Sequence, residues 1–254
     1  MAGRPYVLAE TNWKTVRETE YEVAILPWGA TEAHNFHLPY GTDTLEAEAV
    51  AVEAARLAWE DGARCLVLPP VPFGANAQQV DIPHTINLNP TTQAFVLSDI
   101  VESLDAQGVA KLLILNGHGG NDFRPMIREL QAKTEVFLST LSWYTLPEVA
   151  EHFTEPGDHA GAMETSLMLH LAPEQVLPLS EAGPGKARRF KVKGLREEWA
   201  WAPRNWILVT KDTGVGDPSG ASPEAGAAFF QALTTRVSSF LVDLAKADLE
   251  DLYE

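Results

Sequence analysis

Four apolar, strand-like runs alternate with helix-like segments along this chain, and no other feature limits its fold as much. The runs cover residues 21–27, 64–70, 111–116 and 134–141. Strands that alternate with helices form βαβ units, which give a mostly parallel sheet with helices on both faces. We therefore predict a three-layer α/β/α fold. No segment reads as a linker, so the prediction is a single α/β domain over residues 1–254.

Three helices are predicted with some detail. Thr44 to Trp59 is rich in Ala, Glu, Leu and Val at helical spacing. Asn89-Pro90 and Ser222-Pro223 are typical helix starts, with the polar residue as N-cap and proline at the first helical position. The pattern is irregular over 71–89 and 180–216, which predicts loops or hairpins over the carboxyl edge of the sheet.

Charge and cysteine usage narrow the class of partner. The formal net charge of −16 would repel a nucleic-acid backbone or an anionic membrane, so we expect neither as a partner. The N-terminal stretch has no apolar signal-like core, and no run approaches the length of a membrane span. The single cysteine, Cys65, lies in a strand-like run and cannot form an intrachain disulfide. These features favour a cytoplasmic protein.

Two polar motifs follow strand-like runs, where ligands bind in open α/β sheets. ATEAHNFHLPYGTDT, residues 30–44, places Glu32, His34, His37 and Asp43 in one loop. Asn116-Gly-His-Gly-Gly-Asn121 surrounds His118 with glycines that allow a sharp turn and a close approach to a ligand. Both loops therefore carry residue types that bind divalent metals.

A third signal comes from residues 158–169, which we predict to be helical. Glu164 then shares a face with Leu167, Met168 and Leu171, so a carboxylate lies on an apolar stripe and needs a cation or strong donors opposite it. The predicted oxygen and nitrogen ligands suit Zn²⁺, Mn²⁺ or Fe²⁺: Glu32, His34, Asp43, His118 and Glu164. Capping of a backbone amide or pairing with Arg124 is the alternative for Glu164. We expect His37 to support the site rather than bind metal, and His84, His152 and His170 to be structural.

Five motifs in order resemble the creatininase (creatinine amidohydrolase) family, from about residue 20 to 245. They are Pro27-Trp-Gly-Ala-Thr-Glu-Ala-His34, His37-Leu-Pro-Tyr-Gly-Thr-Asp43, Asn116-Gly-His-Gly-Gly-Asn121, His159-Ala-Gly-Ala-Met-Glu-Thr-Ser166 and Gly214-Val-Gly-Asp-Pro218. The resemblance implies a metal-dependent, oligomeric α/β hydrolase, commonly a hexamer. Members of the family hydrolyse non-peptide amides or formamides, and some act on peptides.

The resemblance also implies roles for individual residues. Glu32 and His34 look like ligands of two different metals, Asp43 like the carboxylate that bridges them, and His118 like a ligand of the first metal. The acid/base histidine of the family falls on His159, which Asp158 or a neighbouring backbone group would orient. Trp143 lies where the family has an active-site tryptophan, and we expect it to form, with Tyr144, an apolar wall of the substrate site.

Departures from creatininase itself concern the second metal and the substrate. Gly119 and Gly120 replace a Tyr and a metal-binding Glu, and Glu155 replaces a substrate-covering Trp. We expect Gly119 and Gly120 to belong to the substrate site, Gly120 to leave space open where the second metal would lie, and Glu164 to supply the missing carboxylate. The chain therefore resembles the His-Gly-Gly branch of the family, and we expect weak creatinine turnover or none.

Together, these observations predict a divalent-metal amidohydrolase with two ions per chain (Zn, Mn or Fe). It would cleave the C–N bond of a small amide, lactam or formamide by attack of metal-bound hydroxide, with His159 protonating the leaving nitrogen. The alternatives are a metal-dependent peptidase and a non-catalytic, metal-binding oligomeric protein. Retention of His159 beside the ligands favours the enzymes.

Overall fold

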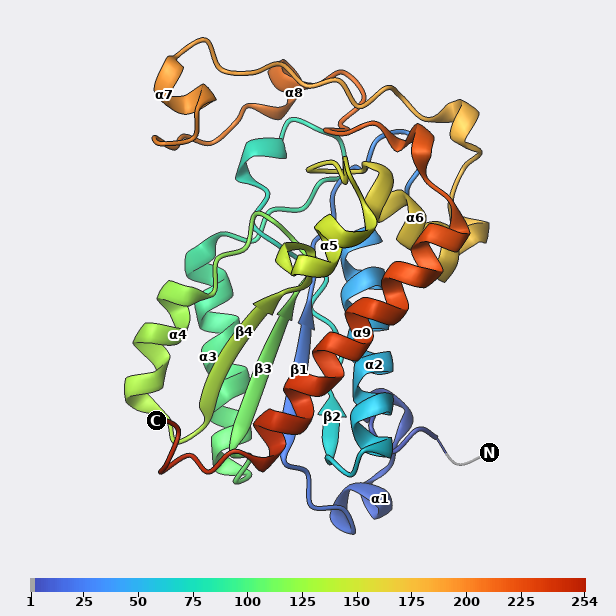
Figure 1. The fold of residues 1–254 in the computed structure, drawn as a ribbon. Coiled ribbons are helices and arrows are strands. Elements are labelled where there is room, and N and C mark those ends of the chain that lie inside the picture. Colours follow the sequence, from blue (N-terminus) through green and yellow to red (C-terminus); the bar gives the residue numbers. More distant parts are fainter. Residues whose placement is uncertain (1–2) are drawn as a thin grey trace.

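Four apolar runs pair in parallel to form one sheet in the computed structural model, which describes residues 3–254 (Figure 1). The strands are β1 (Val23–Trp28), β2 (Cys65–Val67), β3 (Lys111–Asn116) and β4 (Phe137–Ser142), in the order β2-β1-β3-β4. Ile25 pairs with both Val67 and Leu113, which fixes the central register. β2 is shorter than the predicted run 64–70, because two prolines follow Leu68 and proline has no N–H to donate to a ladder.

One face of the sheet is covered by α2 (Thr42–Glu60), α5 (Pro147–His152), α6 (Ala162–Leu171) and α9 (Pro223–Lys246). Alanines on the buried face of α2, such as Ala51 and Ala54, let this helix approach the strands closely. Ser222 caps α9 by accepting a hydrogen bond from the Ala225 N–H, as its sequence predicts. Because α6 packs against both α2 and α9, its position is fixed by the core.

The opposite face is covered by α3 (Pro90–Ala106) and α4 (Arg124–Leu130), which pack Leu97, Val101 and Met126 onto the strands. Pro90 occupies the first turn of α3 as predicted, but the Asn89 side chain accepts a hydrogen bond from Asn87 instead of capping the helix. Helices thus cover both faces of a parallel sheet. The predicted three-layer α/β/α fold is confirmed.

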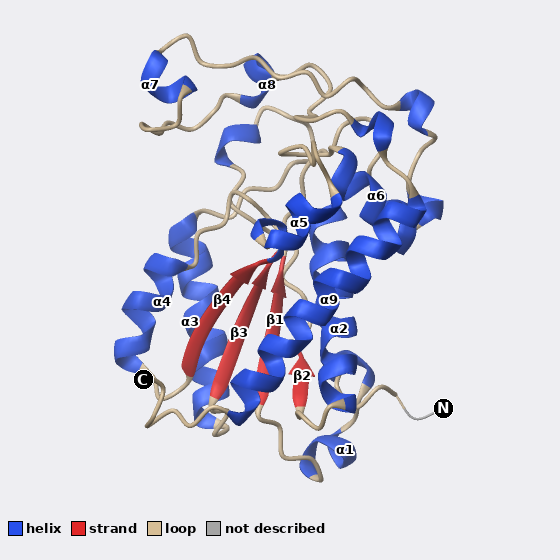
Figure 2. Ribbon diagram, viewed as in Figure 1, coloured by secondary structure: helices blue, strands red, loops and turns tan. Residues whose placement is uncertain are grey.

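The segments 71–89 and 180–216 lie beyond the carboxyl ends of the strands and are mostly loops (Figure 2). They carry only short elements, including α7 (Lys193–Arg196) and α8 (Trp206–Val209), and α1 (Trp13–Arg17) lies at the opposite end of the sheet. The remaining short 3-10 helices are η1 (Leu8–Glu10), η2 (Ala77–Gln79), η3 (Gln131–Lys133), η4 (Trp143–Thr145), η5 (Pro173–Gln175), η6 (Leu179–Glu181) and η7 (Pro218–Gly220). Over residues 3–254, no helix combines the length and the apolar character that a membrane crossing requires.

Candidate metal centre and active site

Six ionisable side chains that are far apart in the sequence meet at the carboxyl ends of the strands. Two come from the loop after β1, one each from the first turn of α2 and the loop after β3, one from the loop before α6 and one from the first turn of α6. Each is at most 9% exposed: Glu32, His34, Asp43, His118, His159 and Glu164. The structure therefore brings together all five predicted metal ligands and the predicted acid/base histidine.

His118 lies between two carboxylates. Its Nδ1 atom is 2.9 Å from Glu32 Oε1 and 2.9 Å from Asp43 Oδ2. One oxygen or nitrogen atom from each of these three residues lies within 4.8 Å of the other two, which is close enough for one ion. Glu32, Asp43 and His118 thus form a first candidate metal site.

Asp43 also faces a second group of ligands. His34 Nε2 is 2.9 Å from Asp43 Oδ1, and ligand atoms of His34, Asp43 and Glu164 lie within 4.8 Å of one another. The Glu164 Oε2 atom accepts a hydrogen bond from the Ala160 N–H. One Glu164 oxygen can therefore hold the backbone while the other binds a cation, so the two roles considered for this residue are compatible. Because Asp43 belongs to both groups, it can bridge two ions.

The three imidazoles are held so that each turns one nitrogen toward the carboxylates. His34 Nδ1, His118 Nε2 and His159 Nε2 lie 3.1, 3.1 and 2.8 Å from the carbonyl oxygens of Glu32, Ala75 and Ala33. When these nitrogens donate to the carbonyls, the other nitrogen of each ring is left with a free lone pair. Such backbone partners fix the tautomer of metal-binding histidines. The residues present therefore fit a divalent metal.

The electrostatics of the cluster agree with a cation site. Burial lowers the pKa of His34, but the Asp43 carboxylate outweighs this effect and the pKa rises to about 10. His118 is likewise buried, and the Glu32 and Asp43 carboxylates hold its pKa well above the usual value. Burial would raise the pKa of Asp43, but His34 and His118 lower it. Positive charge is thus strongly favoured among these carboxylates, as it is in a metal site.

Several residues that support this cluster were not predicted from the sequence. The Gln79 side chain donates to Glu32 Oε2 from the loop after β2. The Asn116 side chain accepts from the His118 N–H and donates to the His118 carbonyl oxygen, which fixes the turn. Asn121 donates to Asn116 Oδ1 and accepts from the Ala75 N–H. The sequence signal for the two asparagines was their place at the ends of the glycine-rich motif.

Asp158 does not orient His159. Its carboxylate is about half exposed and forms an ion pair with Arg204 at 2.6 Å, while His159 is held by the Ala33 carbonyl oxygen. No hydrogen bond or ion pair among the described residues joins Asp158 to His159. The side chain turns outward because Arg204 offers it a partner at the surface. The backbone alternative for orienting His159 is the one that the structure shows.

Trp143 and Tyr144, the predicted aromatic wall, lie next to the turn that carries His118. Trp143 is completely buried and packs on Phe229 of α9, so it belongs to the core beneath the site. Tyr144 is half-buried, and its hydroxyl group donates to the His118 carbonyl oxygen. Trp143 thus packs into the core next to the site, and Tyr144 supports the turn that carries His118. Their role as an apolar wall of the substrate site stays a prediction.

Gly119 and Gly120 differ in the space around them. A Cβ atom at Gly119 would meet nothing within 4 Å, so this position is open. A Cβ atom at Gly120 would overlap the Ala75 carbonyl oxygen and His118 Nε2. The expectation that Gly120 leaves free space is therefore wrong, because the His118 ring and the loop after β2 already fill it.

Trp206 of α8 is an aromatic neighbour of the site that was not predicted. Its ring meets His159 edge to face at a centroid distance of 5.4 Å. The Trp206 N–H donates to the Thr213 carbonyl oxygen, and the Arg204 guanidinium lies 4.5 Å above the Trp206 ring. The segment 180–216 thus closes one side of the cluster, a long-range contact that leaves no local pattern in the sequence.

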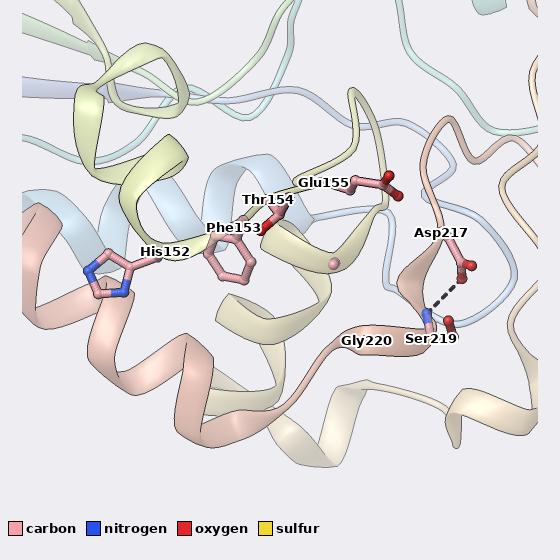
Figure 3. Close-up of a pocket in the computed structure, with 8 residues that line it drawn as sticks. His152, Phe153, Thr154, Glu155, Asp217, Ser219 and Gly220 are labelled. Atoms are coloured by element: carbon pink, nitrogen blue, oxygen red, sulfur yellow. Dashed lines mark hydrogen bonds between the residues drawn. The ribbon is translucent and has the colours of Figure 1, made fainter.

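A pocket of about 340 Å³ lies beside the start of α6 (Figure 3). Phe153, Glu155, Ala162 and Asp217 line it, and Asp217 accepts a hydrogen bond from the Ser219 N–H. None of the six clustered side chains lines this pocket. Glu155, which stands where creatininase has a tryptophan, therefore faces this pocket.

Comparison with known proteins gives consistent matches over most of the chain. Residues 9–241 match the family model for creatininase, described as creatinine amidohydrolase. The mycofactocin precursor peptide peptidase of Mycobacterium ulcerans (strain Agy99) is 30% identical over 215 residues, which are 81% of this chain and 79% of that protein. The creatinine amidohydrolase of Pseudomonas putida is 31% identical over 199 residues, 66% of this chain and 73% of that protein.

Solved structures share the same fold. A protein of Bacteroides fragilis NCTC 9343, provisionally assigned as a creatinine amidohydrolase, is 43% identical, with a TM-score of 0.92 over 98% of this chain and 99% of that one. A creatininase described as Zn-Zn type and a manganese form of creatininase superimpose with TM-scores of 0.79 and 0.76, at 24% and 23% identity over 96% of this chain and 100% of each. The two creatininases support the fold alone.

Proposed function

This chain belongs to the creatininase family, and we propose that it hydrolyses a C–N bond of a small amide, lactam or formamide with the help of two divalent ions. The observation that carries the proposal is the buried cluster in which Asp43 faces two sets of metal ligands, with His159 beside them. His159 also falls in a third group of possible ligands, with Glu32 and His34. The two groups that share Asp43 are complete without His159, so its imidazole stays available for proton transfer, which supports hydrolysis rather than metal storage.

Two sites follow from the ligand groups. Glu32, Asp43 and His118 would hold the first ion, and His34, Asp43 and Glu164 the second. Zn²⁺, Mn²⁺ and Fe²⁺ all suit these ligands. When bound, such ions supply a nucleophile at neutral pH and polarise the carbonyl group of the substrate.

His159 is the proposed general acid. Its Nε2 atom is held by the Ala33 carbonyl oxygen, and its Nδ1 atom lies 3.9 Å from Glu32 Oε1, within the cluster. The Nδ1 lone pair would take a proton from the attacking water and then give it to the leaving nitrogen as the C–N bond breaks. Trp206 packs against the ring and excludes water from that side.

The substrate class follows from burial and from the relatives. The six clustered side chains are nearly inaccessible, which favours a small substrate, since an extended peptide needs an open groove. A metal-dependent peptidase is the second candidate, because a relative that matches 81% of this chain is named as a peptide peptidase.

Metal removal tests the proposal. Protein treated with a chelator should lose hydrolytic activity against its best substrate from a panel of lactams, formamides, creatinine and short peptides. Mn²⁺, Zn²⁺ or Fe²⁺ should restore it, with about two ions bound per chain. We expect little creatinine hydrolysis, with kcat/KM below about 10⁴ M⁻¹s⁻¹, because neither Gly119 nor Gly120 offers a side chain to the substrate. Full activity in the metal-free protein would contradict the mechanism.

We also propose that the chain acts as a single-domain, cytoplasmic homo-oligomer, a hexamer by the resemblance of its motifs. Charge supports self-association. Residues 186–211, which we call the basic arm, contain eight of the 19 Lys and Arg residues and two of the 35 Asp and Glu residues. The arm therefore carries a formal charge of +6, and the rest of the chain carries −22.

A further inference from the structure

Glu46 is a buried carboxyl group that the mechanism above does not use. It lies on α2 one turn after Asp43, so the two side chains point from the same face of the helix. Glu46 is fully buried, and neither of its carboxyl oxygens has a hydrogen-bond partner among the described residues. Burial of a carboxylate without a partner is strongly unfavourable, so the position of Glu46 beside the cluster requires an explanation.

The neighbours of Glu46 make its burial more costly. Burial raises the pKa of Glu46 well above its usual value, and the carboxylates of Glu164 and Asp43 raise it further. With Glu32, four carboxyl groups are thus gathered in one buried region. In the described chain, no Lys or Arg forms an ion pair with any of the four.

The four negative charges of four carboxylates equal the four positive charges of two divalent cations. Three of the four carboxylates belong to the ligand groups, and Glu46 belongs to none of them. Position 120 supplies no carboxylate, because it is a glycine whose Cβ atom would overlap the Ala75 carbonyl oxygen and the His118 ring. Burial favours the neutral form of Glu46 while the site is empty. With two divalent ions bound, Glu46 would supply a fourth negative charge from the same face of α2 as Asp43.

We propose that Glu46 is a charge-balancing positioning residue of the two-ion centre, which allows the second divalent ion to bind beside the first. This inference rests on the proposed metal-dependent function. Without the Glu46 charge, two divalent ions would face three carboxylates, and the ion held by His34, Asp43 and Glu164 would be bound less tightly. Partners behind the ligands commonly change metal affinity by 10- to 100-fold.

Glu46→Gln tests the proposal, since it keeps the shape of the side chain and removes its charge. Metal content and a titration with Mn²⁺ or Zn²⁺ should show two ions per wild-type chain. In the variant the first ion should remain and the affinity for the second should fall at least tenfold. The metal-free variant should have a melting temperature no lower than that of the metal-free wild type. Added metal should raise the melting temperature of the variant less than that of the wild type.

Glu148→Gln is the matched control. Glu148 is also a buried glutamate on a helix, but its partner is Arg236 of α9, at 2.6 Å. Removing this charge should lower the stability of the metal-free protein and leave metal binding unchanged. Glu46→Gln should therefore weaken metal binding without lowering the stability of the metal-free protein. Glu148→Gln should lower that stability without weakening metal binding.

The outcomes distinguish this inference from the proposed function. Two ions bound to Glu46→Gln with wild-type affinity would overturn the inference and leave the function standing. A wild-type protein that binds no divalent metal would overturn the proposed function itself. If Glu46→Gln does not fold, Glu46→Leu removes the charge with an apolar side chain, and the same measurements apply to it.

Discussion

His37 lies next to the cluster and carries a pH dependence of its own. Its Nε2 atom is 2.9 Å from the Thr165 hydroxyl group, and its Nδ1 atom has no partner in the described chain. Burial and the neighbouring His34 lower the pKa of His37 to about 4. The folded protein therefore holds this imidazole neutral, while the unfolded chain protonates it near pH 6.5. The resulting stability is complete above pH 6.5 and is lost as the pH falls toward 4.

His37→Gln should remove this acid sensitivity while keeping a donor for Thr165. Between pH 7 and pH 4 the wild type should lose up to about 3 kcal/mol more of its free energy of unfolding than the variant does. Urea unfolding of both proteins in the presence of a chelator measures the difference, since metal release then contributes to neither. Parallel curves for the two proteins would show that His37 is not held neutral.

The residues of the cluster differ in how far the sequence could predict them. Glu32, His34, Asp43 and His118 stand in short motifs at strand ends, where the fold requires them to meet. The role of Asp158 was predicted wrongly because motif position says nothing about a competing partner, and Arg204 draws its side chain outward. The packing of Trp143 on Phe229 of α9 also leaves no local pattern in the sequence. Glu46 was missed because an acidic residue on a helix usually faces water.

The turn after β3 is the element that fixes His118, and its two glycines are a matched pair. Gly120→Ala should displace the His118 ring, because the new methyl group would overlap it and the backbone of Ala75. We expect loss of the ion at Glu32, Asp43 and His118, a tenfold or greater loss of activity, and destabilisation by about 1–3 kcal/mol. Gly119→Ala, where space is open, should retain metal content and most of the stability. Thermal unfolding and metal analysis of both variants test this, and equal behaviour would contradict it.

At the scale of elements, periodicity predicted most of the fold. Apolar runs and helix starts gave the strands and the long helices to within a few residues, because burial of one face imposes a regular spacing. The sequence located the loops beyond the carboxyl ends of the strands but did not predict their conformation. Contacts such as Trp206 with His159 join residues 47 positions apart, and only the packed structure brings them together.

The whole molecule has an uneven charge distribution that bears on assembly. The basic arm projects with α7 and α8 beyond the carboxyl ends of the strands, on the far side of the molecule from α1 (Figure 1). Trp199 and Trp201 on the arm are 74% and 85% exposed. A basic segment with exposed tryptophans fits the acidic remainder of a second copy of this chain, and oppositely charged surfaces favour such contacts.

Reversing charges on the arm should therefore weaken self-association. Arg188→Glu with Lys191→Glu changes two exposed side chains, and sedimentation velocity should show smaller species than the wild type at the same concentration. The matched control is Lys14→Glu with Arg17→Glu, which makes the same change of charge on α1 at the opposite end of the molecule and should leave the assembly intact. Because the proposed attraction is electrostatic, 500 mM salt should weaken it, since the Debye length is then roughly 4 Å. The wild type at this salt concentration should therefore sediment as smaller species, as the arm variant does. A wild type that is monomeric at low salt, or an arm variant that assembles as the wild type does, would exclude this contact.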